Sequence, residues 1–178
     1  MKLRIKHILK DLDLILLTTE KTSERQIKSE MLSRPGVEIA GFFDFFDAER
    51  LVLIGSKEKH FLNLLPLDIQ KQRLEDMMRR NPPGILFSVS IDVPDWVIEL
   101  GELYNVAILK SKVRTTPLSG QLYQYLHSKL APRTSLHGVL VDIHGMGTLI
   151  TGKSGIGKSE TALELIKRGH ILVSDDRV

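Results

Sequence analysis

Short apolar runs alternate with segments of helical periodicity along most of this chain. Four apolar runs, each bounded by glycine, proline, asparagine or charged residues, predict strands over Leu14–Leu17, Leu51–Ile54, Ile85–Val89 and Val106–Leu109. The segments between them predict helices over Val37–Phe43, Lys57–Leu65, Leu67–Arg80 and Pro94–Leu103. Because strands that alternate with helices form parallel sheets, we predict a small N-terminal α/β domain with a mostly parallel sheet.

A longer helix follows, opened by Pro117. Leucines at every fourth position give it one apolar stripe, made of Leu118, Leu122, Leu126 and Leu130. The run 131–135 contains a proline and polar residues and ends the helix. We therefore predict a domain boundary here, with residues 1–130 in the N-terminal α/β domain and residues 131–178 in a second domain.

The second domain begins with a predicted antiparallel hairpin. Apolar residues alternate from Val139 to Ile143, the run 144–147 with its two glycines predicts a turn, and Thr148–Thr151 predicts the returning strand. This hairpin leads directly into a glycine-rich segment. A nucleotide-binding domain built on a parallel sheet does not begin in this way.

The composition excludes several classes of protein. The chain has 178 residues and no cysteine, so disulfides, zinc–thiolate sites and thiol nucleophiles are excluded. The 25 basic and 22 acidic residues are spread along the sequence, and the largest basic group is Arg79–Arg80, which predicts no nucleic-acid partner. No apolar run approaches the roughly 20 residues of a spanning helix, and no signal peptide is visible. We expect a soluble cytoplasmic protein without a membrane partner.

The glycine-rich segment matches the phosphate-binding pattern G-x-x-x-x-G-K-[ST] at every fixed position. Its members are Gly152, Lys153, Ser154, Gly155, Ile156, Gly157, Lys158 and Ser159. Glycines let the backbone curl so that successive N–H groups form an anion nest, and the following helix adds its N-terminal N–H groups. Lys158 is expected to bind the β- and γ-phosphates, and the Ser159 hydroxyl to ligate Mg²⁺. The predicted buried face of that helix is Ala162, Leu163, Leu165 and Ile166.

Two adjacent acids follow the next predicted strand, which covers residues 171–174. Because ligands bind at the carboxyl ends of strands, Asp175 or Asp176 is expected to face the phosphates and act as a base. The alternative is that this pair only begins a turn. His137, taken alone, is more readily explained as a packing residue. The remaining histidines have no partner at metal-ligand spacing, so no histidine metal site is predicted.

Two segments resemble the bacterial HPr kinase/phosphorylase family. One runs from Leu136 through the glycine-rich loop to Asp176, and the other is Ser33–Phe43, with the sequence SRPGVEIAGFF. The resemblance implies an enzyme that phosphorylates a serine of the phosphocarrier protein HPr, using ATP or pyrophosphate with Mg²⁺, and reverses the reaction by phosphorolysis. It also implies a hairpin-led kinase domain similar to phosphoenolpyruvate carboxykinase, a role in sugar uptake, and a hexameric assembly.

The resemblance also assigns roles to residues. The loop Gly152–Ser159 would bind the nucleotide, with Lys158 catalytic and Ser159 on the metal. Asp176 would accept the serine proton in the kinase direction and return it in the reverse direction, with Asp175 as the alternative. His137 matches an active-site histidine of the family. Lys153 departs from the family pattern, which often has an acid there, but the position tolerates variation.

The second departure is the chain end at Val178, where the family's catalytic domain continues. We therefore expect a truncated kinase domain, weak nucleotide binding and negligible phosphate transfer by the 178-residue chain. Two other functions stay open. One is a P-loop ATPase or small-molecule kinase with a different acceptor. The other is a nucleotide-sensing or oligomerisation module without catalysis.

Overall fold

The computed structural model describes residues 2–89, 91–132 and 135–175. The chain divides into two compact units, Met1–Ala131 and Pro132–Val178. Each unit has its own sheet and its own core.

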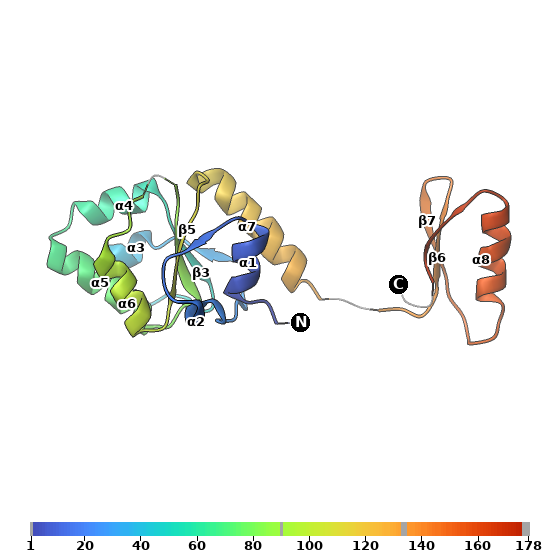
Figure 1. Cartoon of the computed structure of the whole chain (residues 1–178), viewed down its shortest axis with the longest axis horizontal. Coiled ribbons are helices and arrows are strands. Elements are labelled where there is room, and N and C mark those ends of the chain that lie inside the picture. Colours follow the sequence, from blue (N-terminus) through green and yellow to red (C-terminus); the bar gives the residue numbers. More distant parts are fainter. Residues whose placement is uncertain (1, 90, 133–134, 176–178) are drawn as a thin grey trace. The chain divides into compact units, whose positions relative to one another are not determined.

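The first unit is built on a five-stranded sheet with the strand order β1-β5-β4-β3-β2 (Figure 1). The strands are β1 (Ile15–Leu16), β2 (Leu32–Ser33), β3 (Leu51–Ile54), β4 (Gly84–Phe87) and β5 (Ala107–Lys110). Strands β2 to β5 are parallel, and only the edge strand β1 runs antiparallel, against β5. The predicted mostly parallel sheet is therefore confirmed.

Helices cover both faces of this sheet. They are α1 (Ile5–Asp11), α2 (Glu20–Ser23), α3 (Gly36–Ile39), α4 (Ser56–Asn63), α5 (Leu67–Arg79), α6 (Asp95–Leu103) and α7 (Thr115–Leu130). Successive residues of β3 point to opposite faces, so Leu51 and Leu53 pack with α1 and α7. Val52 and Ile54 pack with α3 to α6 instead. This burial on both faces explains why the strand is a continuous apolar run.

Several elements differ from the sequence prediction. Helix α3 ends at Ile39, so the predicted helix over residues 37–43 was too long. The phenylalanines beyond it lie outside helices and strands and form the ring pairs Phe42–Phe45 and Phe43–Phe46. Helices α1 and α2 and strand β2 were not predicted. Strand β2 has only two residues, which is too short to show a periodic pattern.

The second unit has a three-stranded antiparallel sheet with the order β7-β6-β8. Its elements are β6 (Val139–Ile143), β7 (Met146–Ile150), α8 (Lys158–Lys167) and β8 (Ile171–Ser174). The predicted hairpin is present as β6 and β7. Its turn is narrower than predicted, because Met146 already pairs with Ile143 and belongs to β7.

A small core lies between α8 and this sheet. Val139, Val141 and Ala162 are buried, and Ile150 and Leu165 pack against them. Leu163 was predicted in the same face, and this prediction was wrong, since 57% of the residue is exposed. Residues at spacings of three and four share a helix face, whereas Leu163 directly follows Ala162 and is rotated away. Within the described residues, no helix is long and apolar enough to cross a membrane.

Candidate functional site

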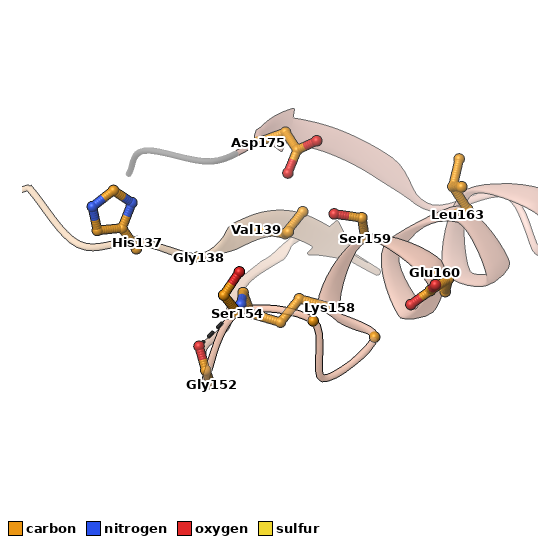
Figure 2. A pocket seen from close by; sticks show the side chains of 12 residues that line it. His137, Gly138, Val139, Gly152, Ser154, Lys158, Ser159, Glu160, Leu163 and Asp175 are labelled. Atoms are coloured by element: carbon orange, nitrogen blue, oxygen red, sulfur yellow. Dashed lines mark hydrogen bonds between the residues drawn. The ribbon is translucent and has the colours of Figure 1, made fainter.

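The antiparallel pairing of the second unit brings three chain segments to one end of its sheet. Val139 at the start of β6 pairs with Ile150 at the end of β7. Leu140 pairs with Ser174 at the end of β8. The segment before β6, the loop after β7 and the residue after β8 therefore meet at this end, together with the N-terminus of α8 (Figure 2). The catalytic candidates of the sequence come from these segments.

A cavity of about 890 Å³ opens at this end of the sheet. It is lined by His137, Gly138, Val139, Gly152, Ser154, Gly155, Gly157, Lys158, Ser159, Glu160, Leu163 and Asp175. All of these residues belong to the second unit. The lining combines hydroxyls, an imidazole, an ammonium and carboxylates on a glycine-rich wall, which suits a polar, phosphorylated ligand better than an apolar one.

The glycine-rich loop has the backbone conformation that its sequence requires. Gly157 is the N-cap of α8 and has a φ of +97°, in the left-handed region that side chains rarely adopt. A Cβ atom added there would lie 3.0 Å from Oε2 of Glu160. The loop therefore turns sharply into α8, and the helix N-terminus lies at the cavity wall. Backbone N–H groups and the helix dipole at such a position favour a bound anion.

Lys158 is held by the loop that it follows. Its Nζ atom donates a hydrogen bond of 2.9 Å to the carbonyl oxygen of Gly152 (Figure 2). A second bond of 2.9 Å goes to the carbonyl oxygen of Lys153. These bonds keep the ammonium at the cavity wall, in contact with oxygen acceptors. Phosphate oxygens are stronger acceptors than carbonyls because they are charged, so an anion in the cavity would compete for this ammonium.

The residues present fit a magnesium–nucleotide ligand. Ser159 lines the cavity one position beyond Lys158, and Ser154 lines it from the loop. Hydroxyl oxygens are ligands that Mg²⁺ accepts together with phosphate oxygens and water. Lys153 and Ile156 are loop residues that do not line the cavity, and 68% of Ile156 is exposed.

The candidate base and the candidate histidine both reach the cavity. Asp175 follows β8 and His137 precedes β6, and each lines the cavity from its own segment (Figure 2). Asp175 also lies in a bend directly after β8, so the alternative that the acid pair begins a turn stays open. The other candidate base, Asp176, lies outside the described residues.

Four residues that line the cavity were not predicted as site residues: Gly138, Val139, Glu160 and Leu163. Glu160 and Leu163 both line the cavity from the first two turns of α8. Glu160 lies three positions after Gly157, so helical spacing places it on the same side of α8 as the loop. This signal was present in the sequence. Leu163 was hidden because an apolar residue in an amphipathic helix is usually assigned to the core.

Comparison with protein families gives two matches that together cover nearly the whole chain. The family model described as "HPr Serine kinase N terminus" matches residues 3–126. The model described as "HPr Serine kinase C-terminal domain" matches residues 128–178.

Curated relatives give the same result. An HPr kinase/phosphorylase of Geobacillus sp. (strain WCH70) is 49% identical over 177 residues. Those of Geobacillus kaustophilus (strain HTA426) and Bacillus subtilis (strain 168) are 49% and 47% identical over the same length. In each case the match covers 99% of this chain and 57% of the relative, so the chain spans little more than half the length of these relatives.

A solved structure gives a much weaker match. It contains the CBS and DRTGG domains of the regulatory region of Clostridium perfringens pyrophosphatase. The TM-score is 0.47 at 9% identity, over 67% of this chain and 45% of that one, which is too low to add to the assignment.

Proposed function

The chain belongs to the HPr serine kinase family, and from this membership we propose that its protein phosphorylates a serine of HPr and reverses that reaction by phosphorolysis. ATP or pyrophosphate is the proposed phosphoryl donor, with Mg²⁺. The control of sugar uptake and a hexameric assembly, both implied by the family resemblance, are part of the same proposal.

One observation carries the proposal. A single cavity is lined by the phosphate-binding loop, by Asp175 and by His137, although these residues come from three separate segments. A nucleotide-binding module needs only the loop and the helix N-terminus. A phosphoryl transferase also needs a group that accepts a proton from the attacking hydroxyl, and a carboxylate in the phosphate cavity supplies one.

The donor phosphates would lie along the loop and at the N-terminus of α8. In that position Lys158 would exchange its bonds to Gly152 and Lys153 for phosphate oxygens, and Ser159 would hold the metal. When bound, Mg²⁺ reduces the repulsion between the phosphates and the attacking oxygen. His137 would contact the transferred phosphoryl group from the opposite segment.

The transfer step exchanges one phosphorus–oxygen bond for another. The serine oxygen of HPr forms a bond to the terminal phosphorus, and the bond from that phosphorus to the bridging oxygen of the donor breaks. A carboxylate of the Asp175–Asp176 pair takes the hydroxyl proton, and the donor leaves as ADP or orthophosphate. In reverse, orthophosphate attacks the phosphoserine phosphorus, pyrophosphate forms, and the same carboxyl group returns the proton to the serine oxygen.

The test uses the protein as its source cells make it, incubated with HPr and either Mg·ATP or Mg·pyrophosphate. We expect phosphate on one HPr serine, and its removal as pyrophosphate when orthophosphate is added. Asp175→Asn and Asp176→Asn are compared singly. The variant that removes the base should lower transfer by at least about a hundredfold while nucleotide affinity stays within a few fold. Glu164→Gln, which changes an exposed carboxylate on α8 outside the cavity lining, serves as the control.

Two results would overturn the proposal. Transfer of phosphate to water or simple alcohols without HPr would favour the ATPase or small-molecule kinase. Nucleotide binding that depends on Lys158, with no transfer to HPr in any variant, would favour the binding module. The same assay on the 178-residue chain tests the expectation that it transfers negligibly.

A further inference from the structure

Two histidines that are 26 positions apart in the sequence meet at the end of the second unit's sheet that is remote from the cavity. The ring centroids of His144 and His170 lie 4.8 Å apart, with an angle of 87° between the ring planes. His144 is exposed and His170 is half-buried. Neither residue lines the phosphate cavity, and the proposed function uses neither.

The topology explains why they meet. His144 lies in the turn between β6 and β7, and His170 lies between α8 and β8. Strand β6 pairs with β8 in antiparallel fashion, and Asp142 near the end of β6 is opposite Ile171 at the start of β8. The turn after β6 and the connection before β8 are therefore neighbours.

Hydrogen bonds of the backbone hold the two segments that carry these histidines. The N–H of His170 donates to the carbonyl of Leu165 at 3.1 Å, which ties it to the last turn of α8. In the hairpin turn, the N–H of Gly145 donates to Oδ1 of Asp142 at 2.6 Å. His144 has a φ of +52° and Gly145 a φ of +83°, as the two central residues of a two-residue hairpin turn require.

We propose that His144 and His170 form a site for a divalent transition-metal ion of the Zn²⁺ class. Imidazole nitrogen is a ligand that Zn²⁺, Ni²⁺ and Cu²⁺ share, whereas Mg²⁺ takes oxygen ligands. The ring centroids are 4.8 Å apart in an edge-to-face contact, so both side chains would turn to direct one nitrogen each at a shared ion, at Zn–N bonds of about 2.0–2.1 Å. The site is thus chemically distinct from the magnesium position at Ser159.

The site has fewer protein ligands than a structural zinc site. Among the described residues no group of three or more His, Cys, Asp or Glu side chains is positioned to hold a metal. Water therefore completes the coordination, and the ion is exchangeable. Bound there, it links the β6–β7 turn to the connection between α8 and β8, so it should stabilise the second unit in proportion to its occupancy.

The test is a calorimetric titration of the chelator-stripped 178-residue chain with ZnCl₂ alone. Co²⁺ in place of Zn²⁺ gives a visible absorption that reports nitrogen ligation. His144→Asn and His170→Gln remove one imidazole each, and asparagine is chosen because it tolerates the left-handed backbone of position 144. His60→Ala is the control, since this exposed histidine lies on α4 in the first unit.

We expect one Zn²⁺ ion per chain at this site. Since loss of even an outer-shell partner of a metal ligand costs 10–100-fold in affinity, each variant should bind at least about tenfold more weakly. The double variant should lose the Co²⁺ absorption, and His60→Ala should change neither. Unchanged Zn²⁺ affinity in the double variant, with its hydrogen-exchange pattern in α8 preserved, would overturn the proposal. An equal loss of Zn²⁺ affinity in His60→Ala and in the double variant would also overturn the proposal.

Discussion

The ammonium of Lys158 donates a 2.9 Å hydrogen bond to the carbonyl oxygen of Gly152, the first residue of its own loop. A second bond of the same length joins it to the carbonyl of Lys153. The positive charge is therefore held by the loop backbone at the wall of the cavity.

This arrangement predicts the effect of replacing Lys158. Lys158→Met keeps most of the apolar stem and removes the charge. Since hydrogen bonds to charged groups contribute about 1.5–3 kcal/mol, affinity for Mg·ATP or pyrophosphate should fall about 10- to 100-fold. Lys167→Met removes a similar charge from the last turn of α8, outside the cavity lining, and should bind normally. Calorimetric titration measures both, and equal affinities for the two variants would contradict the prediction.

A second prediction concerns the left-handed backbone of Gly157. Gly157→Ala forces an L side chain into a φ of +97° and places its Cβ 3.0 Å from Glu160. The strain should cost about 1–2 kcal/mol and also displace the phosphate-binding N–H groups. Hydrogen exchange in α8 should become faster, and nucleotide affinity should fall.

Gly145→Ala is the matched control for this substitution. Gly145 also has a positive φ, +83°, but it lies in the hairpin turn and a Cβ there meets open space. This variant should lose similar stability and keep its nucleotide affinity. A loss of affinity as large as that of Gly157→Ala would mean that general destabilisation, and not the loop geometry, controls binding.

A third substitution should stabilise the first unit. Gly120 lies inside α7, where a Cβ atom would have no neighbour within 4 Å. Alanine at such a position avoids the entropy cost of glycine, so Gly120→Ala should add about 0.5–1 kcal/mol to the free energy of unfolding. The protein has one tryptophan, Trp96 in α6, so its fluorescence during urea unfolding reports this unit. An unchanged or lower urea midpoint would refute the prediction.

The ion pair between Arg34 and Glu58 predicts a pH dependence. The guanidinium donates to both carboxylate oxygens, at 2.8 and 2.9 Å, and the N–H of Gly55 donates at 2.9 Å. Burial alone would raise the pKa of Glu58, but these hydrogen bonds outweigh it, and the pKa lies below its usual value of 4.5. A lowered folded-state pKa means that the carboxylate adds stability above pH 4.5, which is lost as the pH falls through the folded-state pKa.

In Glu58→Gln, the free energy of unfolding of the first unit should therefore depend less on pH in the acid range. Arg34→Met removes the same ion pair from the other side and should reduce the dependence in a similar way. Urea unfolding followed by Trp96 fluorescence between about pH 3 and 6 measures this slope. A slope that is the same in the original protein and in Glu58→Gln would show that other carboxylates control the acid transition.

Much of the first unit was predictable from local patterns. The four buried residues of β3 form an uninterrupted apolar run, and the stripe from Leu118 to Leu126 marks the buried face of α7. Elements of one or two turns, such as α3, were misjudged because so few residues carry no clear period. The glycine-rich loop was the clearest signal, since its conformation depends on glycine positions within eight consecutive residues.

The sequence by itself determined the α/β class, the hairpin and the glycine-rich loop that follows it, because each depends on neighbours along the chain. Only the tertiary structure decided which segments meet. The antiparallel pairing of β6 with β7 and β8 places Asp175 and His137 at the phosphate cavity and His144 against His170 at the opposite end. Strand pairing is a long-range property, and no local pattern in the 26-position interval between His144 and His170 encodes their contact.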